Sequence, residues 1–293
     1  MLPFELDLLR WISENSSNLL EKIAECITML GEETVFIVIV AFLYFVTNKK
    51  LGQKLLYVMC GNICLNNTIK NFAKVERPFV VDPSITPARV ETATGYSFPS
   101  GHTQTMAGWS TTLAAHLKKS WATIVTIILI ILVALSRVYL RVHYPSDVVI
   151  GAILGVTSAL VFGLVYDLKE NKLIPLLITS GVYLIFAIIF LFGMDANFAD
   201  FYKIFGILIG FTVAYAFEDG LVKFDNDGPL WKRIIRFIIG VGIAVGLKMG
   251  LKSLFNLFEV SLTIQPILDF VRYFLMAFIA LGIYPWIFKK LKF

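Results

Sequence analysis

Residues 121–147 read WATIVTIILIILVALSRVYLRVHYPSD, and this stretch decides the fold. Its first sixteen residues carry no charge. With the residues that follow, the run reaches about the 20 residues that a helix needs to cross a bilayer. A short polar turn comes next, and a second long apolar run begins directly after Asp147. Two such runs joined by a short turn predict a pair of membrane-spanning helices.

The composition of the whole chain places it among integral membrane proteins. Of its 293 residues, 57% are hydrophobic and only 16% are charged, whereas an average soluble domain is about 45–50% apolar and about 25% charged. The same figures exclude disordered, collagen-like and disulfide-rich secreted proteins. The formal net charge is +5, but the basic residues are scattered among apolar runs. We therefore expect a membrane surface or an anionic substrate as their partner, and no nucleic acid.

Nine segments have the length and apolar character of membrane helices, which predicts an all-α fold, a polytopic transmembrane helical bundle. The third segment contains so many Thr, Ser and Gln side chains that we expect it inside the bundle, away from lipid. The nine segments are residues 34–47, 52–72, 102–117, 121–139, 147–167, 173–193, 200–219, 231–250 and 270–288.

Residues 1–33 precede the first span and show a different pattern. Leu19, Ile23, Ile27 and Leu30 form an apolar stripe along one side of a helix whose other side carries charged residues. This pattern predicts an N-terminal amphipathic helix that lies in the membrane interface.

The basic residues orient the bundle, because inward loops of membrane proteins carry an excess of lysine and arginine. With the N-terminus outside, every inward segment contains a basic cluster, and fourteen of the chain's 26 basic residues fall on that side. We therefore predict a multi-pass protein of the cell membrane with its N-terminus outside and its C-terminus in the cytoplasm. The fourteen are Lys49, Lys50, Lys54, Lys118, Lys119, Lys169, Lys172, Lys223, Lys232, Arg233, Arg236, Lys289, Lys290 and Lys292.

A long outward connection runs over residues 74–99, and loops of this length in a compact protein are usually functional. Lys70, Arg77 and Pro78 lie at its start. If the preceding helix continues to the residue before Pro78, the spacing of seven puts Lys70 and Arg77 on one helical face. There, an ammonium and a guanidinium group suit a tetrahedral oxyanion. The alternative is that both side chains only extend toward the interface to keep their charges in water.

The same loop ends in SFPSGH, residues 97–102, where the third span begins. Proline, serine and glycine at a helix start leave backbone N–H groups available to an anion. His102 beside them can exchange a proton near neutral pH. Ser100, Gly101 and His102 are therefore candidate site residues, and the alternative is an ordinary helix cap beside an unrelated histidine.

A second outward connection, residues 139–146, joins the fourth and fifth spans. Arg137 just before it is an ionisable group at the membrane edge, which is by default a functional hypothesis. Pro145 suits the first turn of the fifth span and puts Asp147 near the N-terminus of that helix. Asp147 either caps the helix or accepts a hydrogen bond from the ring of His143. In the second case His143 becomes a better nucleophile.

Together, the outward segments resemble the three-part signature of the type 2 phosphatidic acid phosphatase superfamily, which includes membrane lipid phosphatases. The resemblance implies a six-helix catalytic core, which would cover residues 34–193. Residues 194–293 would then form about three additional C-terminal transmembrane helices beyond the usual core. They would serve either as a structural extension or to shape a lipid entrance or bind a partner. The matching pattern is Lys70-x6-Arg77-Pro78, then Pro99-Ser100-Gly101-His102, then Ser136-Arg137-x5-His143-x3-Asp147.

The resemblance also implies a role for each matching residue. His143 would attack phosphorus and form a phosphohistidine, with Asp147 holding its tautomer, while His102 would protonate the leaving group and later activate water. It implies no metal and no other cofactor. Because His143 must be neutral and His102 charged, we expect a bell-shaped pH dependence. The phosphoryl oxygens would be held by Lys70, Arg77, Ser100, the Gly101 amide and Arg137.

We therefore expect an integral membrane phosphatase that hydrolyses a lipid phosphate or diphosphate on the outer face of the membrane. The first candidate substrate is a polyprenyl diphosphate, followed by phosphatidylglycerophosphate and phosphatidate. Two alternatives would use the same residues. One is a lipid phosphotransferase that passes the phosphate to another lipid, and the other is a non-enzymatic membrane protein that binds an anion or a lipid. The oligomeric state is left open.

Overall fold

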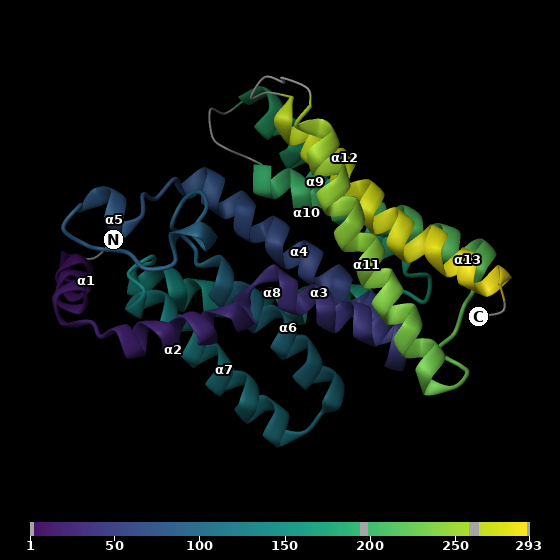
Figure 1. The fold of residues 1–293 in the computed structure, drawn as a ribbon, viewed down its shortest axis with the longest axis horizontal. Coiled ribbons are helices and arrows are strands. Elements are labelled where there is room, and N and C mark those ends of the chain that lie inside the picture. The colour runs from purple at the N-terminus through teal and green to yellow at the C-terminus, as the bar shows by residue number, and fades with distance from the viewer. Residues whose placement is uncertain (1–2, 194–198, 258–263, 292–293) are drawn as a thin grey trace. The chain divides into compact units, whose positions relative to one another are not determined.

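Every segment predicted as a membrane span is helical in the structure, a computed structural model that describes residues 3–193, 199–257 and 264–291. Within these ranges no strand is present, and the predicted all-α transmembrane fold is confirmed (Figure 1). The expected boundary at residue 194 and the inward Lys292 lie outside the described residues. The helices are α1 (Pro3–Asn15), α2 (Asn18–Thr28), α3 (Glu33–Phe42), α4 (Lys49–Ala73), α5 (Pro78–Val81), α6 (Gly101–Leu117), α7 (Ser120–Tyr139), α8 (Pro145–Asp167), α9 (Leu173–Gly193), α10 (Ala199–Phe217), α11 (Leu230–Phe255), α12 (Gln265–Phe278) and α13 (Tyr284–Lys290).

Six helical stretches of the described chain are long and apolar enough to cross a membrane. A seventh is added if Asn18–Gly31 and Glu33–Thr47, which meet at a 46° bend, form one span. Helices α4 and α6 are outside this set, and both carry many polar side chains. In α6 the polar residues Thr103, Gln104 and Ser110 are buried, which confirms that the third predicted span lies inside the protein.

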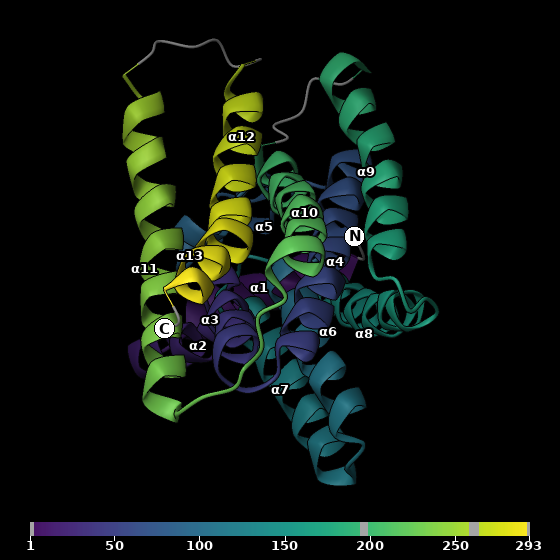
Figure 2. The same ribbon diagram turned by 90° about the vertical axis from the view of Figure 1, so that its right-hand side faces the viewer.

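The chain divides into two compact units, and the first contains Met1–Phe36 and Leu65–Gly163. Within this unit α6 and α7 form a hairpin (Figures 1 and 2), and α2 packs against α7. The centre of the hairpin is apolar, because Met106 and Ala107 of α6 pack on Ile130 and Val133 of α7. This packing fixes the position of α6 relative to α7.

The N-terminal segment forms two helices and a short turn, where the sequence suggested one helix. Helix α2 begins after Ser17, whose hydroxyl accepts a hydrogen bond from the N–H of Leu20 at 3.3 Å, as an N-cap does. The α2 residue Thr28 is buried, while Leu19 and Ile23 are exposed. The buried face joins the first unit, and the expected position of the exposed face in the membrane interface stays a prediction.

The second unit contains Ile37–Cys64 and Leu164–Phe293. Within it, α12 lies between α10 and α11 and contacts both (Figure 2). Helices α10 and α12 approach closely at two glycines of α10. A Cβ atom added at Gly206 would lie 2.5 Å from the backbone oxygen of Phe270, and one at Gly210 would lie 2.5 Å from that of Phe274. Glycine therefore permits this packing, as small residues often do between membrane helices.

Candidate active site

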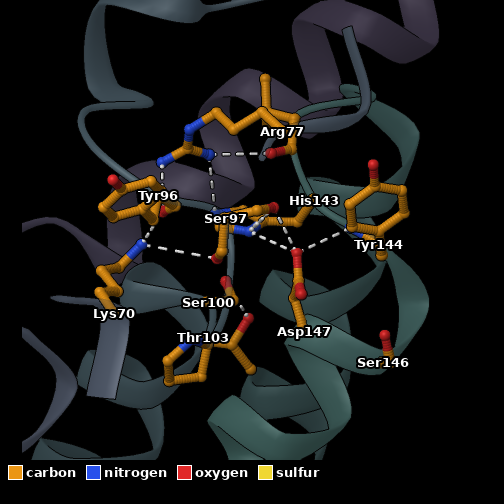
Figure 3. A network of polar contacts seen from close by, with 12 residues as sticks. Lys70, Arg77, Tyr96, Ser97, Ser100, Thr103, His143, Tyr144, Ser146 and Asp147 are labelled. Carbon is orange, nitrogen blue, oxygen red and sulfur yellow. Dashed lines mark hydrogen bonds and ion pairs between the residues drawn. The ribbon is translucent and has the colours of Figure 1, made fainter. Parts of the chain in front are cut away.

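The residues predicted to carry the chemistry all lie in the first unit, where α4 ends and where α6 and α8 begin. Figure 3 shows most of them from close by, joined by polar contacts. They come from α4 (Lys70), from the loop that follows it (Arg77), from the start of α6 (Ser100, Gly101 and His102), from the end of α7 (Arg137) and from the junction of α7 and α8 (His143 and Asp147).

His143 and Asp147 form the buried pair that the spacing suggested. Helix α8 begins at Pro145, so Asp147 lies in its first turn and turns back toward the preceding residues. His143 Nδ1 lies 3.1 Å from Asp147 Oδ2, and both side chains are buried. The carboxylate therefore holds the ring proton on Nδ1 and leaves the lone pair of Nε2 available.

The surroundings of His143 favour its neutral form. Burial, and then the positive charges of Arg77, Arg137 and Lys70, lower the pKa of His143 well below its usual value of about 6.5. A histidine with a lowered pKa is neutral at pH 7, and only the neutral ring has a lone pair on Nε2.

Ser97 belongs to the same network, and sequence reasoning missed its role. Its hydroxyl donates to Asp147 Oδ2 at 2.5 Å and lies 3.4 Å from His143 Nδ1 (Figure 3). The N–H of Tyr144 is a further donor to the same carboxylate oxygen, at 3.0 Å. Ser97 stands only five residues before His102 in the sequence, but its contact with Asp147 joins positions fifty residues apart. No local pattern signals such a contact.

The backbone around Arg77 corrects one prediction. Helix α4 ends at Ala73, and Lys74 adopts the left-handed conformation with a φ of 49°. Arg77 itself is extended, with φ −74° and ψ 154°, because the residue before a proline is pushed out of the helical region. The predicted common helical face for Lys70 and Arg77 is therefore wrong. The loop, and not the helix, brings Arg77 to the site.

The Arg77 guanidinium joins the loop to the α7–α8 junction. It donates from Nε to the carbonyl of Gly95 at 2.9 Å, from Nη2 to that of Thr94 at 2.7 Å and from Nη1 to that of Val142 at 2.8 Å. Nη1 also lies 3.3 Å from His143 Nε2 (Figure 3). Burial lowers the pKa of Arg77 to about 10, so the group stays charged at neutral pH. A cation thus stands beside the nitrogen that would attack phosphorus.

Lys70 and Asn66 connect α4 to the loop and to α6. Lys70 Nζ donates to the backbone carbonyl of Tyr96 and lies 3.5 Å from that of Ser97. One turn earlier on α4, Asn66 donates from its side-chain amide to Gln104 Oε1 at 2.8 Å. These contacts hold residues 96–104 against α4.

The start of α6 is held against the first turn of α8. Helix α6 begins at Gly101 with Ser100 as its N-cap residue. The N–H of Ser100 donates to the backbone carbonyl of Asp147 at 3.0 Å. A Cβ atom added at Gly151 would lie 2.7 Å from the Ser100 carbonyl oxygen, so glycine allows the two segments to approach. Ser100 and Gly101 are thereby fixed close to the His143–Asp147 pair.

Arg137 and His102 carry buried nitrogen atoms that contact no acceptor in the part of the chain that the structure describes. Arg137 is fully buried, and its Nη1 donates to the hydroxyls of Thr28 at 3.1 Å and Thr92 at 3.4 Å. Its Nε and Nη2, and the Nε2 of His102, are buried without a hydrogen-bond partner among the described residues. A buried donor left unpaired costs about 1–3 kcal/mol, and more when it is charged. Such donors are suited to an anionic ligand.

The structure thus brings all eight predicted residues into one part of the first unit. His143, Asp147, Arg77, Lys70 and Ser100 are linked by the contacts above, and Arg137 and His102 act electrostatically on His143. Thr28 and Ser97 join them as contacts that the sequence did not reveal. The catalytic and binding roles of these residues stay predictions.

Comparison with protein families gives two adjacent matches. Residues 52–171, which include every predicted site residue, match the PAP2 superfamily. Residues 202–293 match the transmembrane extension of PAP2 superfamily phosphatases. The last helices are therefore a known extension of this superfamily, and they lie beyond the residues that match the superfamily itself.

Several individual proteins are similar to parts of this chain. A Sulfolobus acidocaldarius protein named undecaprenyl-diphosphatase is 34% identical over 156 residues, which are 53% of this chain and 74% of the relative. The decaprenylphosphoryl-5-phosphoribose phosphatase of Mycobacterium tuberculosis is 39% identical over 90 residues, 30% of this chain and 46% of the relative. A Bacillus subtilis phosphatidylglycerolphosphate phosphatase of the PAP2 type, known from its crystal structure, is 25% identical with a TM-score of 0.49, over 57% of this chain and 87% of that one. The chain belongs to the PAP2 superfamily of membrane lipid phosphatases, and its last helices are the superfamily's transmembrane extension.

Proposed function

We propose that this protein hydrolyses a lipid phosphate or diphosphate at the outer face of the membrane through a covalent phosphohistidine. The proposal rests on the orientation of the His143 ring and on the groups beside its two nitrogen atoms. Its Nδ1 contacts Asp147 at 3.1 Å, and its Nε2 faces the guanidinium of Arg77 at 3.3 Å. A neutral imidazole oriented by a carboxylate and placed beside a cation is suited to attack a phosphoryl group.

In the first step, Nε2 of His143 forms a bond to phosphorus while the bond from phosphorus to the leaving oxygen breaks. His102 donates a proton to that oxygen, and the lipid leaves. In the second step, His102 takes a proton from water as the water oxygen attacks phosphorus. The phosphorus–nitrogen bond breaks, inorganic phosphate leaves and His143 is neutral again. Asp147 holds the Nδ1 proton throughout and stabilises the charge on the ring in the intermediate.

Charge on the phosphoryl oxygens is stabilised by cations of the chain. Arg137 supports this role best, because its Nε and Nη2 are buried donors without a partner in the described chain. Lys70 and Arg77 add positive charge next to His143. In phosphoryl transfer, most of the catalysis comes from positioning and from preorganised cations that stabilise the charge of the transition state. The reaction is proposed to need no metal ion.

The proposed substrate is a polyprenyl diphosphate, ahead of phosphatidylglycerophosphate and phosphatidate. One relative favours it by name, since the Sulfolobus protein is an undecaprenyl-diphosphatase. The name of the mycobacterial protein supports a polyprenyl-linked lipid as substrate, but it names a phosphoribose and not a diphosphate. The outward position of the site rests on the basic clusters of the opposite segments. A site at the bilayer surface allows a lipid tail to remain in the membrane while its phosphate reacts.

Phosphate release by the purified protein in detergent tests this proposal, with EDTA present and a panel of lipid mono- and diphosphates as substrates. His143→Ala is expected to lower turnover by at least about a thousandfold for every substrate, as loss of a nucleophile does. His116→Ala is the matched control, because His116 is an exposed histidine at the far end of α6. Full activity of the His143 variant, or loss of wild-type activity on adding EDTA, would refute the mechanism.

A further inference from the structure

A second arginine, Arg89, lies beside Arg137 and has no role in the mechanism above. It belongs to the loop between α5 and α6 and adopts the left-handed conformation with a φ of 57°. The short 3₁₀ turn Val90–Thr92 follows it directly. This turn brings the loop back toward Arg137, since the Thr92 hydroxyl accepts a hydrogen bond from Arg137 Nη1 at 3.4 Å.

The Thr92 hydroxyl connects the two arginines. It accepts from the Arg137 guanidinium and donates to the backbone carbonyl of Arg89 at 3.4 Å. The Arg89 side chain is held from the other side, because its Nη2 donates to the carboxylate of Glu32. Its Nε is buried and, like Nε and Nη2 of Arg137, finds no hydrogen-bond partner in residues 3–193, 199–257 and 264–291.

The residue before Glu32 lies against His102. A Cβ atom added at Gly31 would lie 2.6 Å from the backbone oxygen of His102. Arg89 therefore approaches His102 along the same N-terminal segment, and its charge acts on that histidine together with the charge of Arg137. The unpartnered donors of Arg89, Arg137 and His102 belong to one neighbourhood.

This neighbourhood is on the leaving-group side of the proposed reaction, because His102 is the group that protonates the leaving oxygen. In a lipid monophosphate that oxygen belongs to a neutral alcohol. In a lipid diphosphate it belongs to a second phosphate, which keeps its own negative charge and non-bridging oxygens. A further guanidinium on the leaving-group side favours the second case, since guanidinium groups bind phosphate oxygens with paired hydrogen bonds.

We propose that Arg89, beside the Arg137 that holds the terminal phosphoryl group, binds the lipid-linked phosphate of a diphosphate substrate and makes the enzyme prefer diphosphates to monophosphates. This inference rests on the proposed function. His143 attacks the terminal phosphorus, the bond from that phosphorus to the bridging oxygen breaks, and the lipid monophosphate leaves with its charge stabilised by Arg89. Glu32 holds the Arg89 side chain in place, so the N-terminal segment takes part in substrate selection.

The test compares kcat/KM for undecaprenyl diphosphate and undecaprenyl monophosphate in wild-type protein and in Arg89→Gln. We expect the diphosphate-to-monophosphate ratio to fall about 10- to 100-fold, the effect of losing a hydrogen bond to a charged group. Arg89→Lys keeps the charge and should restore part of the ratio. Arg10→Gln removes an exposed arginine that pairs with Asp82 and Asp7, and it should leave the ratio unchanged.

An equal loss of both activities in Arg89→Gln would overturn the inference, because the Arg89–Glu32 pair would then only fasten the loop. If that variant does not fold, inhibition of monophosphate hydrolysis by inorganic diphosphate decides the matter. Inorganic diphosphate should inhibit the wild type at a lower concentration than inorganic phosphate does. In Arg89→Lys, the inhibitory concentrations of the two anions should lie closer together. Equal inhibition of the wild type by both anions would overturn the inference. Failure of the proposed function would give a different result from failure of this inference, because the wild type would then hydrolyse neither lipid.

Discussion

Replacing Ser97 by alanine removes one hydrogen bond from the carboxylate that orients His143. The Ser97 hydroxyl donates to Asp147 Oδ2 at 2.5 Å, and both residues are buried. After the change, Oδ2 keeps the Tyr144 N–H at 3.0 Å and His143 Nδ1 at 3.1 Å. Ser97 is a positioning residue, because it touches Asp147 and His143 and would act on the substrate only through them.

The expected magnitude follows from the charge and burial of this contact. A hydrogen bond to a charged group contributes about 1.5–3 kcal/mol, and each 1.36 kcal/mol changes a rate by about tenfold. Ser97→Ala should therefore lower kcat about 10- to 150-fold. KM should stay within about twofold, because the interaction serves the chemical step more than substrate binding. Ser97→Thr keeps the hydroxyl and should recover most of the lost activity.

Steady-state phosphate release from a lipid phosphate in detergent measures both parameters. The matched control is Ser84→Ala, because Ser84 donates to Asp82 at 2.7 Å in the same loop but is exposed. Its kcat should match the wild type. The reasoning about Ser97 is refuted if its alanine variant keeps kcat within about threefold of the wild type. A rise in KM at unchanged kcat would refute it as well, since Ser97 would then serve binding.

Further predictions concern pH, charge and packing. Because burial and nearby cations lower the pKa of His143, the ring is neutral above that lowered value. The acid limb of the kcat/KM profile due to His143 should therefore lie below pH 6.5, and a flat profile from about pH 4 to 9 would contradict the acid–base assignment. On the basic side, activity should fall where His102 loses the proton that it must donate, and it should fall further as the medium approaches the Arg77 pKa of about 10. Arg137→Met should raise KM about 10- to 100-fold and also raise the Tm measured without ligand, since it removes buried unpaired donors. Inorganic phosphate should then raise the Tm of the wild type only, and equal stabilisation of both proteins would contradict an anion-binding role. Gly206→Ala should lower stability by about 1–3 kcal/mol in detergent unfolding experiments, because its Cβ would meet the Phe270 carbonyl at 2.5 Å. Gly242→Ala in α11 has no atom within 4 Å of its Cβ and should not lower stability; the packing argument fails if both variants unfold alike.

The membrane helices and the contact between His143 and Asp147 could be predicted because their sequence signals are local. An apolar run of sufficient length specifies a membrane helix through its own transfer free energy, wherever the rest of the chain lies. Pro145 starts α8 for an equally local reason, since it fits the first turn of a helix. With that start fixed, the spacing of four residues from His143 to Asp147 already implied their contact.

The exit from α4 was less predictable. The sequence indicated an end at Pro78, but the helix stops at Ala73, and Lys74, the next residue, is left-handed. Non-glycine residues adopt that conformation only where surrounding contacts offset its cost. Here the hydrogen bonds of Arg77 to the carbonyls of Gly95 and Val142 are such contacts. They join segments that no periodic pattern relates.

The sequence by itself therefore determined the all-helical membrane fold, the family and the contact between His143 and Asp147. The tertiary structure decided which groups hold that pair and where charge remains unpaired. Ser97 reaches Asp147, Thr28 reaches Arg137, and Glu32 reaches Arg89, across separations of 50, 109 and 57 residues. Hydrogen bonds and ion pairs act only over a few ångströms, so such partners exist only once the helices have brought them together.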